Sequence, residues 1–394
     1  MLQDKFQNLR DALDAELVER SEIVDTMILS LLSKTHHFQL GTPGVAKSYS
    51  IRKLESHIDG FGPGDSFEVL LTRFTSLEEV MGPFDLRALE DGHYRRNTDG
   101  MAPDAKFWFI DEIFKCSSSL LNSLLWALNE RQFRNDGTVV DIPLWTMFSA
   151  SNELPESDEL GALFDRIHFR MLTKPIQESS SFVQMLSDRK TELSGVTNRK
   201  IISWTDIETA YQEVMNVDIP IDVLEALNSV RGLMRAEGIE PTDRRFVESL
   251  RIIKACAWLD GQATADVEHC RPLAHMFWDT PDQISKVQRI MLELANPLDK
   301  KALELLEVVE KMQSELDKLL REDMDQQIKN KRGVELHNRV DRATKELAAL
   351  SAEVKASGRR SAKTEEVRTK LLRVTRSLLK DMFNINVPED QINL

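Results

Sequence analysis

Residues 38–58 read FQLGTPGVAKSYSIRKLESHI, and this stretch decides the fold. The short apolar run from Phe38 to Leu40 predicts a buried strand, and YSIRKLESHI at 49–58 predicts a helix. Between them lies GTPGVAKS, residues 41–48. Strand, glycine-rich loop and helix in this order are what a phosphate-binding loop requires. The loop fits the pattern GxxxxGK[ST], except that Ala46 stands where the last glycine is usual.

The residue types of this loop suit a nucleotide with Mg²⁺. Gly41 and Gly44 let the backbone turn its N–H groups toward phosphate, and the N-terminus of the next helix adds a partial positive charge. Lys47 would reach the β and γ phosphates, and the Ser48 hydroxyl would ligate Mg²⁺. On these residues alone, an ordinary glycine-rich turn is the alternative. The nucleotide-contacting residues predicted in the loop are Gly41, Thr42, Pro43, Gly44, Val45, Ala46, Lys47 and Ser48.

Further strands are predicted downstream of the loop. The runs FEVLLTRF (67–74), FWFI (107–110) and LWTMFSAS (144–151) are apolar and separated by helical or loop stretches. Strands that alternate with helices indicate an α/β fold with a parallel sheet covered on both faces.

Polar residues follow two of these strands. Asp111 and Glu112 come directly after FWFI. In an ATPase the first acid holds the shell of the magnesium ion, through water, and the second positions and activates the water that attacks the γ phosphate. Asn152 ends the next strand and can orient that water by hydrogen bonding. Taken singly, the acidic pair is also typical of a solvated turn, and Asn152 of a turn or helix cap.

The strand pattern fades after about residue 200. We predict an α/β core at 1–200, a helical lid at 201–281 and a C-terminal helical extension at 282–394. In the extension, apolar residues recur in alternating steps of four and three, which is typical of a supercoiling seam. We expect a long helix interrupted at Gly333, then a turn at 357–363 and a last helix ending near Phe383. A helical hairpin or three-helix extension is the plain interpretation, to which a partner-binding role can be added. The seam residues are Leu298, Ala302, Leu305, Val309, Met312, Leu316 and Leu319.

Composition narrows the function classes. The chain has 394 residues, more than a single core usually holds, with 41% hydrophobic and 29% charged residues, as in globular proteins. The formal net charge of −14 disfavours a surface dominated by nucleic-acid phosphates, although it does not exclude a local basic pore. Cys116, Cys256 and Cys270 lack disulfide or zinc spacing. We expect a cytoplasmic protein without a secretory signal or membrane span.

The order of these motifs makes the chain resemble the AAA+ ATPases. Within them, GTPGVAKS, LEEVMGPFDLRAL (77–89) and DEIFKCSSSLLNSLLWALNERQFRNDG (111–137) look like MoxR proteins, for which Ala46 is expected. SASNELPE (149–156) and TDRRF (242–246) look most like the RavA branch. The resemblance covers roughly residues 15–280 and implies an AAA+ core with a helical lid.

The resemblance also implies roles for arginines. GALFDRIHF (161–169) places Arg166 as an arginine finger that enters the site of the neighbouring subunit, with Arg170 as the alternative. TDRRF places Arg245 as the sensor 2 residue that contacts the γ phosphate from the lid, and Arg244 is the weaker claimant. A finger that acts in trans implies a homo-oligomeric ring, which we expect to be a hexamer.

Two segments and three functions complete the expectations. Residues 78–84 resemble the helix-2 insert of MoxR proteins, and FRNDGTVVDIP (133–143) predicts a β-hairpin from its Asn-Asp-Gly turn. The leading hypothesis is a ring ATPase that remodels or matures protein assemblies, with a protein substrate and a partner that carries a von Willebrand factor A (VWA) domain. The alternatives are a nucleic-acid motor, which would need a basic pore, and a nucleotide-gated scaffold.

Overall fold

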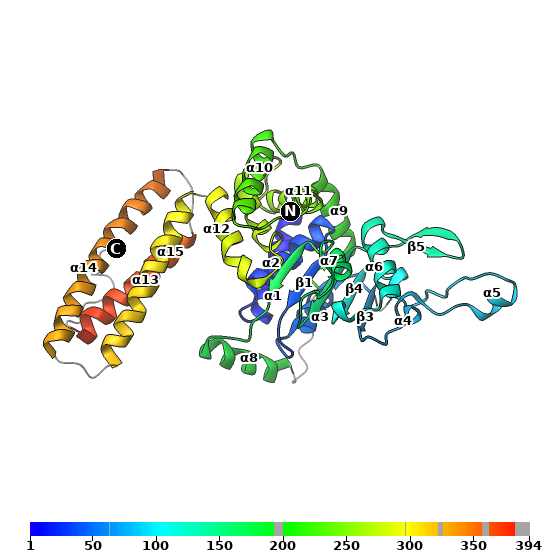
Figure 1. Ribbon diagram of the computed structural model, residues 1–394, viewed down its shortest axis with the longest axis horizontal. Helices are drawn as coiled ribbons and strands as arrows, with labels where there is room; N and C mark the ends of the chain where they lie inside the picture. Colours follow the sequence, from blue (N-terminus) through cyan, green and yellow to red (C-terminus); the bar gives the residue numbers. More distant parts are fainter. Residues whose placement is uncertain (63, 193–199, 296, 322–325, 357–361, 383–394) are drawn as a thin grey trace. The chain divides into compact units, whose positions relative to one another are not determined.

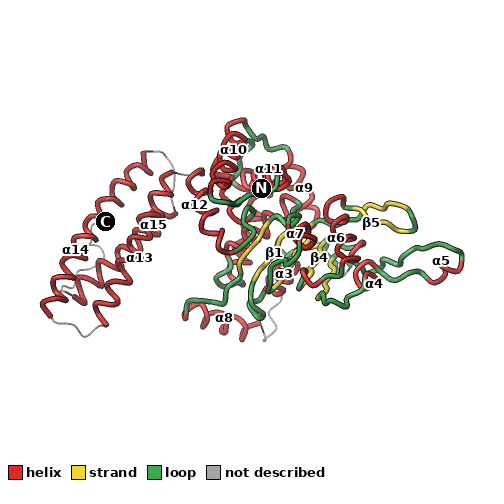
Figure 2. The backbone as a smooth tube through the Cα atoms, in the orientation of Figure 1, coloured by secondary structure: helices red, strands yellow, loops and turns green. Residues whose placement is uncertain are grey.

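The computed structural model describes residues 1–62, 64–192, 200–295, 297–321, 326–356 and 362–382 (Figures 1 and 2). The chain divides into two compact units, Met1–Met291 and Leu292–Leu394. Each unit is described by itself. No helix among the described residues is both long and apolar enough to cross a membrane.

The first unit is built on a parallel five-stranded sheet. Its strands, in spatial order, are β3 (Ser66–Leu70), β4 (Phe107–Asp111), β7 (Thr146–Ser151), β1 (His37–Leu40) and β8 (Phe169–Leu172). The parallel α/β sheet predicted from the sequence is confirmed. Two strands are shorter than predicted, since residues 71–74 and 144–145 lie outside them.

Strand β8 was not predicted, because Arg170 interrupts the apolar run at 169–172. The three central strands are buried along their length, apart from the half-buried Asp111 at the end of β4, because both faces of a parallel sheet are covered. Phe107 of β4 and Phe148 of β7 illustrate this, since their rings pack edge to face at 5.7 Å between centroids.

Helices accompany the strands in the order that the sequence predicts (Figure 1). Two amphipathic helices precede β1, the helix after the glycine-rich loop is α3, and α6 and α7 lie between later strands. A helical region follows β8, as expected. The bounds are α1 Leu2–Glu16, α2 Ser21–Ser33, α3 Lys47–Ser56, α6 Ser118–Glu130, α7 Asp158–Phe164, α8 Ser179–Glu192, α9 Trp204–Met215, α10 Ile221–Ala236, α11 Asp243–Leu259 and α12 Ile284–Ala295. Strands β2 (Ile58–Asp59) and β9 (Ile202–Ser203) form a small parallel pair.

Two insertions leave the sheet. The first lies between β3 and β4 and carries the short helices α4 (Leu77–Met81) and α5 (Leu86–Glu90). The second lies between α6 and β7 and is an antiparallel pair of β5 (Gln132–Asn135) and β6 (Thr138–Asp141). The β-hairpin predicted from the Asn-Asp-Gly turn is thereby confirmed.

The second unit is a three-helix bundle of α13 (Pro297–Arg321), α14 (Gln326–Ala356) and α15 (Ala362–Ser377). These helices share one apolar core, in which six residues of the predicted seam are buried, from Ala302 to Leu319. The side chain of Leu298, the seventh, is not among those described. The predicted break at Gly333 is wrong, because Gly333 lies within α14. One glycine costs a helix only about 1 kcal/mol relative to alanine, which packing of a long helix outweighs. Most of the turn predicted at 357–363, and Phe383, lie outside the described residues.

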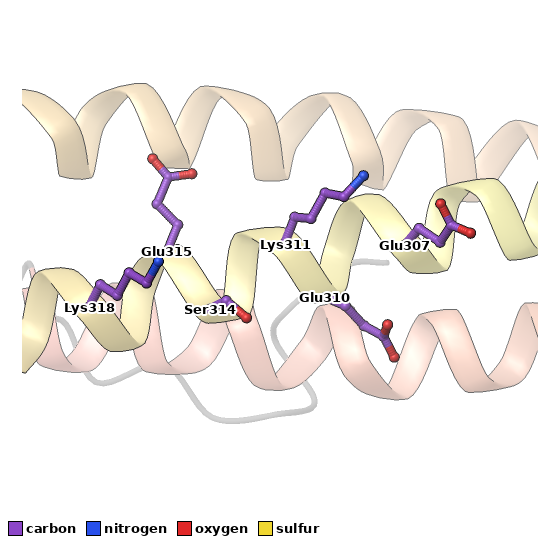
Figure 3. A pocket seen from close by; sticks show the side chains of 6 residues that line it. All are labelled: Glu307, Glu310, Lys311, Ser314, Glu315 and Lys318. Atoms are coloured by element: carbon purple, nitrogen blue, oxygen red, sulfur yellow. The ribbon is translucent and has the colours of Figure 1, made fainter. Parts of the chain in front are cut away.

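The surface of the bundle is charged. Figure 3 shows a groove along α13 that is lined by six mostly charged side chains. Glu310 forms an ion pair with Lys370 of α15, and Glu315 forms one with Arg339 of α14, each at 2.5 Å. These carboxylates therefore tie the helices of the bundle to one another. The residues that line the groove are Glu307, Glu310, Lys311, Ser314, Glu315 and Lys318.

Candidate nucleotide site

The register of the parallel strands gathers the predicted motifs at one edge of the sheet. Leu40 at the end of β1 is paired with Ser151 at the end of β7, and Asp111 at the end of β4 is paired with Ala150. The glycine-rich loop, the acidic pair and Asn152 follow these strand ends directly. They therefore lie beside one another at the carboxyl edge, which is where open α/β sheets bind ligands.

The glycine-rich loop starts with a residue that cannot carry a side chain. The Gly41 N–H donates to the carbonyl of Ser151 at 3.1 Å. A Cβ added at Gly41 would lie 2.5 Å from the carbonyl oxygen of Thr173. Gly44 has a φ of +85° and nothing within 4 Å of a Cβ placed there. The loop thus leaves open space where its backbone would meet a phosphate.

Ala46 has the conformation that explains why glycine is usual at its position. Its φ is 66° and its ψ is 27°, in the left-handed region, directly before α3. An L-residue pays about 1–2 kcal/mol for this conformation, which glycine adopts freely. Apart from glycine, alanine has the smallest side chain, and the loop adopts this left-handed conformation with alanine at position 46.

Lys47 lies folded over the loop that it follows. Its buried ammonium group donates to the carbonyl of Gly41 at 2.6 Å and to that of Thr42 at 3.3 Å. Burial lowers the pKa of Lys47, and the carboxylates of Asp111 and Glu112 oppose this by favouring the charged form. The lysine therefore lies between the loop and the acidic pair. A phosphate oxygen could take the place of its carbonyl acceptors.

The second residue of the acidic pair, Glu112, has a strained backbone. Asp111 is half-buried, and its Oδ1 accepts a hydrogen bond from the Glu112 N–H at 3.0 Å. Glu112 has φ 53° and ψ 44°, a left-handed conformation that non-glycine residues hold mainly at functional sites. Its Oε2 lies 3.1 Å from Lys115 Nζ, yet this buried oxygen accepts no aligned hydrogen bond from the described residues. It is thus available to a water or ligand.

The arginines considered for this site lie in two segments, residues 166–170 and 244–245. Arg166 is half-buried behind α7, where its Nε donates to Asn129 Oδ1 at 2.9 Å and its Nη1 donates to the Ala162 carbonyl at 2.6 Å. Burial lowers the pKa of Arg166, and the nearby charge of Arg244 lowers it further, against Asp165. The hydrogen bonds of Arg166 among the described residues are thus to α6 and α7 rather than to the glycine-rich loop.

Arg170, the alternative finger, is a buried structural residue. It is fully buried, and its guanidinium donates to the carbonyls of Trp278, Phe164 and Ile167 and to Asp279 Oδ1, the last at 2.7 Å. Burial, and then the charge of Arg245, lower its pKa to about 9. A guanidinium held by its own chain in this way cannot reach a neighbouring subunit without unfolding the segment.

Arg245 and Arg244 occupy different environments although they are adjacent. The Arg245 side chain is 6% exposed, and it pairs with Asp165 at 3.0 Å and with Asp279. The Arg244 side chain is 44% exposed and lies 3.4 Å from Asp165. Arg244 is therefore the more exposed of the two, and Arg245 is held between two carboxylates.

Sequence reasoning missed the two carboxylates that organise these arginines. Asp165 accepts from Thr242, Arg244 and Arg245, and Asp279 accepts from Arg170 and Arg245. Burial alone would raise the pKa of Asp279, but the two arginines hold it below its usual value. The network ties residues 165–170 to the start of α11. No local pattern predicts it, because its bonds join residues that are 34 to 109 positions apart in the sequence.

Comparison with known proteins agrees with this geometry. Residues 4–212 match the family model described as the MoxR domain in the MoxR-vWA-beta-propeller ternary systems. The chain belongs to the MoxR family of AAA+ ATPases. Residues 222–291 of this MoxR protein match a second family model, the AAA lid domain.

This MoxR protein is similar in sequence to proteins of Methanocaldococcus jannaschii and of a virus. An uncharacterized protein of Methanocaldococcus jannaschii is 35% identical over 315 residues, which are 80% of this chain and 82% of that protein. A second uncharacterized protein of the same organism is 34% identical over 313 residues, 79% of this chain and 80% of that protein. A structural protein of Acidianus two-tailed virus is 29% identical over 213 residues, 52% of this chain and 34% of that protein.

A solved structure shares the fold. It is a Cytophaga hutchinsonii protein, provisionally named an ATPase, with a TM-score of 0.58 and 16% identity, and the match covers 74% of this chain and 94% of that one. The AAA+ fold predicted from the sequence, with its lid and helical C-terminal region, is confirmed.

Proposed function

We propose that this MoxR protein hydrolyses ATP with Mg²⁺ and works as a ring. The observation that carries the proposal is the register of β1, β4 and β7, which brings Lys47, Glu112 and Asn152 to one edge of the sheet. A glycine-rich loop for phosphate, a carboxylate for water and an amide to orient that water are the parts that phosphoryl transfer to water needs.

The residues of this edge fit Mg-ATP. Residues 41–48 would hold the phosphates through backbone N–H groups and Lys47. Ser48 would ligate Mg²⁺, and Asp111 would hold it through water; bound Mg²⁺ would neutralise charge on the phosphates. Glu112, with its unsatisfied Oε2, would accept the proton of the attacking water, and Asn152 would orient that water.

Arg166 and Arg244 would complete the site of a neighbouring subunit. Both lie near Asp165, and the charge of Arg244 is felt at Arg166. Because the two cations lie close enough to interact electrostatically, one phosphate of the next subunit would meet both. We propose a closed ring for this reason, with a hexamer as the expected size and Arg245 as the support of Arg244.

The biological role we propose is the remodelling or maturation of protein assemblies with a VWA-domain partner. The matched family model is named for systems that contain a vWA protein, and TDRRF keeps a RavA-like branch as the expected subgroup. Co-purification with the product of a neighbouring VWA gene, or stimulation of ATP turnover by it, tests this role. A VWA protein that neither binds nor stimulates the ring would contradict it.

Two substitutions test the ATPase itself. Lys47→Ala should abolish ATP binding in calorimetry, because the main cationic contact with the phosphates is removed. Glu112→Gln should keep ATP affinity and lose about 10²–10⁴-fold in turnover, the usual contribution of a general base. Glu153→Gln, at an exposed carboxylate one residue beyond Asn152, is the matched control and should keep turnover. Full turnover of Glu112→Gln would refute the assignment.

A further inference from the structure

The hairpin turn of the second insertion is bonded to the first insertion. Residues 82–97, here called the arm, include α5 and lie in the first insertion. The Tyr94 N–H donates to Asp136 Oδ1 at 2.8 Å, and His93 Nδ1 lies 2.8 Å from Asp136 Oδ2. The Arg96 N–H donates to Asn135 Oδ1 at 2.6 Å, and Asn135 Nδ2 donates to the Arg96 carbonyl at 3.2 Å. Figure 1 shows α5 and β5 on insertions that leave the same side of the first unit.

These bonds close an open β edge. Within the arm, the Asp85 N–H donates to the Arg95 carbonyl and the Asn97 N–H donates to the Pro83 carbonyl, both at 2.8 Å. Residues 95 and 97 thus pair inward. The backbone groups of Tyr94 and Arg96 alternate with them and face the other way, because successive residues of an extended strand bond to opposite sides. An unpaired edge of this kind exposes free N–H and C=O groups. The side chains of Asn135 and Asp136 form hydrogen bonds with these groups.

The hairpin turn does not need these side chains for its own shape. Asp136 and Gly137 have φ values of 51° and 74°, as the two central residues of a type I′ turn require, and asparagine or glycine serves as well at the first of them. The Asp136 carboxylate and the Asn135 amide instead bond to residues 39–43 positions earlier in the chain. The polar groups of these two side chains therefore bond to the arm rather than to their own turn.

Contacts within the arm make it stiff enough to move with the hairpin to which it is bonded. Arg96 Nη1 donates to the Gly82 carbonyl at 2.8 Å, and its guanidinium lies 4.2 Å from the centre of the Phe84 ring. A Cβ at Gly82 would lie 2.0 Å from the Asn97 carbonyl oxygen, so the two ends of the arm meet closely. Two apolar side chains of the arm, Leu86 and Tyr94, are 75% and 68% exposed.

The hairpin lies between the two catalytic elements along the chain. Glu112 leads through α6 into β5, and β6 leads through β7 to Asn152. A change at the nucleotide edge that shifts α6 or β7 will therefore reach the hairpin. The arm has its own connection to this edge through β3 and β4, and its bonds to Asn135 and Asp136 add a direct link to the hairpin.

We propose that Asn135 and Asp136 form a clamp that makes the arm move with the hairpin when the nucleotide changes. The two insertions then act as one mechanical body that presents Leu86 and Tyr94. The nucleotide-dependent half of this inference rests on the proposed ATPase function; the clamp itself does not.

Amide exchange tests the clamp without nucleotide. Asn135→Ala removes both bonds to Arg96, and Asp136→Gly removes both bonds to residues 93–94 while keeping a residue that tolerates positive φ. Exchange at the Arg96 and Tyr94 amides, respectively, should rise about tenfold, the worth of one well-made hydrogen bond. The Asn97 amide, bonded within the arm, is the internal control. Thr138→Val is the matched variant, because Thr138 Oγ1 donates only to the Asn135 carbonyl in the same hairpin. Unchanged exchange at Tyr94 and Arg96 would overturn the clamp.

Exchange with and without a non-hydrolysable ATP analogue tests the transmission. In the full chain, segments 93–97 and 132–141 should respond together. In the Asn135→Ala, Asp136→Gly double variant, the response of 132–141 should remain and that of 93–97 should be smaller. An arm that responds equally in the double variant would overturn the coupling. If the analogue binds neither protein, the ATPase proposal fails, while the nucleotide-free result on the clamp stands.

Discussion

Replacing Arg245 or Arg244 by methionine should separate structure from catalysis at two adjacent positions. The Arg245 side chain is 6% exposed, and it bridges Asp165 and Asp279. Its removal leaves both carboxylates with fewer neighbouring cations in a partly buried site. Breaking a buried ion pair in this way typically lowers the free energy of unfolding by about 3–5 kcal/mol. Because Asp279 is 40% exposed and keeps Arg170, we expect the lower end, about 3 kcal/mol.

Arg244→Met should behave in the opposite way. Its side chain is 44% exposed and its one ion pair is long, at 3.4 Å, so the loss of stability should stay below about 1 kcal/mol. If Arg244 meets the phosphate of the next subunit, turnover should fall by about 10²-fold or more, toward the range of arginine fingers.

Urea unfolding and steady-state ATP hydrolysis, measured on both variants, decide between the two adjacent arginines. The reasoning is refuted if Arg244→Met hydrolyses ATP at the full rate, or if Arg245→Met is as stable as the parent protein.

Two further predictions concern the core and the loop. Burial lowers the pKa of His37 and of His168 to about 3, against about 6.5 in an unfolded chain. The unfolded state binds more protons between these values, so stability is full above pH 6.5 and falls as the pH drops toward 3, by about 3 kcal/mol per pH unit for the pair. Proton uptake by this pair on unfolding at pH 5 should therefore be close to two; an uptake of one or less would contradict the burial of both rings. Ala46→Gly should keep ATP affinity, whereas Ala46→Val should weaken it because a β-branched residue resists positive φ; calorimetry that ranks them in the reverse order would exclude the role we give this backbone.

The nucleotide edge could be predicted from the sequence because its signals are local. The loop at 41–48 and the acidic pair at 111–112 are short motifs directly after apolar strands, and parallel strands bring their ends together. The hairpin at 133–143 could likewise be predicted from its turn residues. In each case the residues that define the feature are neighbours in the chain.

The arginine network could not be predicted, because it depends on contacts across the fold. Arg170 resembles an arginine-finger candidate in sequence, and only its burial against Trp278 and Phe164 shows that it is structural. Arg244 and Arg245 are adjacent in the first turn of α11. The positions of Asp165 and Asp279 determine that Arg245 is the one buried between two carboxylates. The break predicted at Gly333 failed for a related reason, since helix packing outweighs a local preference.

The central claim is that one subunit completes the nucleotide site of the next. Mixing Arg166→Ala subunits with Glu112→Gln subunits tests it most directly, because each alone lacks one part of every site. In an equal mixture, about one interface in four should combine an intact Glu112 with an intact Arg166 from the neighbour, given head-to-tail contacts. We predict that ATP turnover reappears on mixing and follows the fraction of such interfaces. Mixed rings that stay inactive at every ratio would contradict the claim.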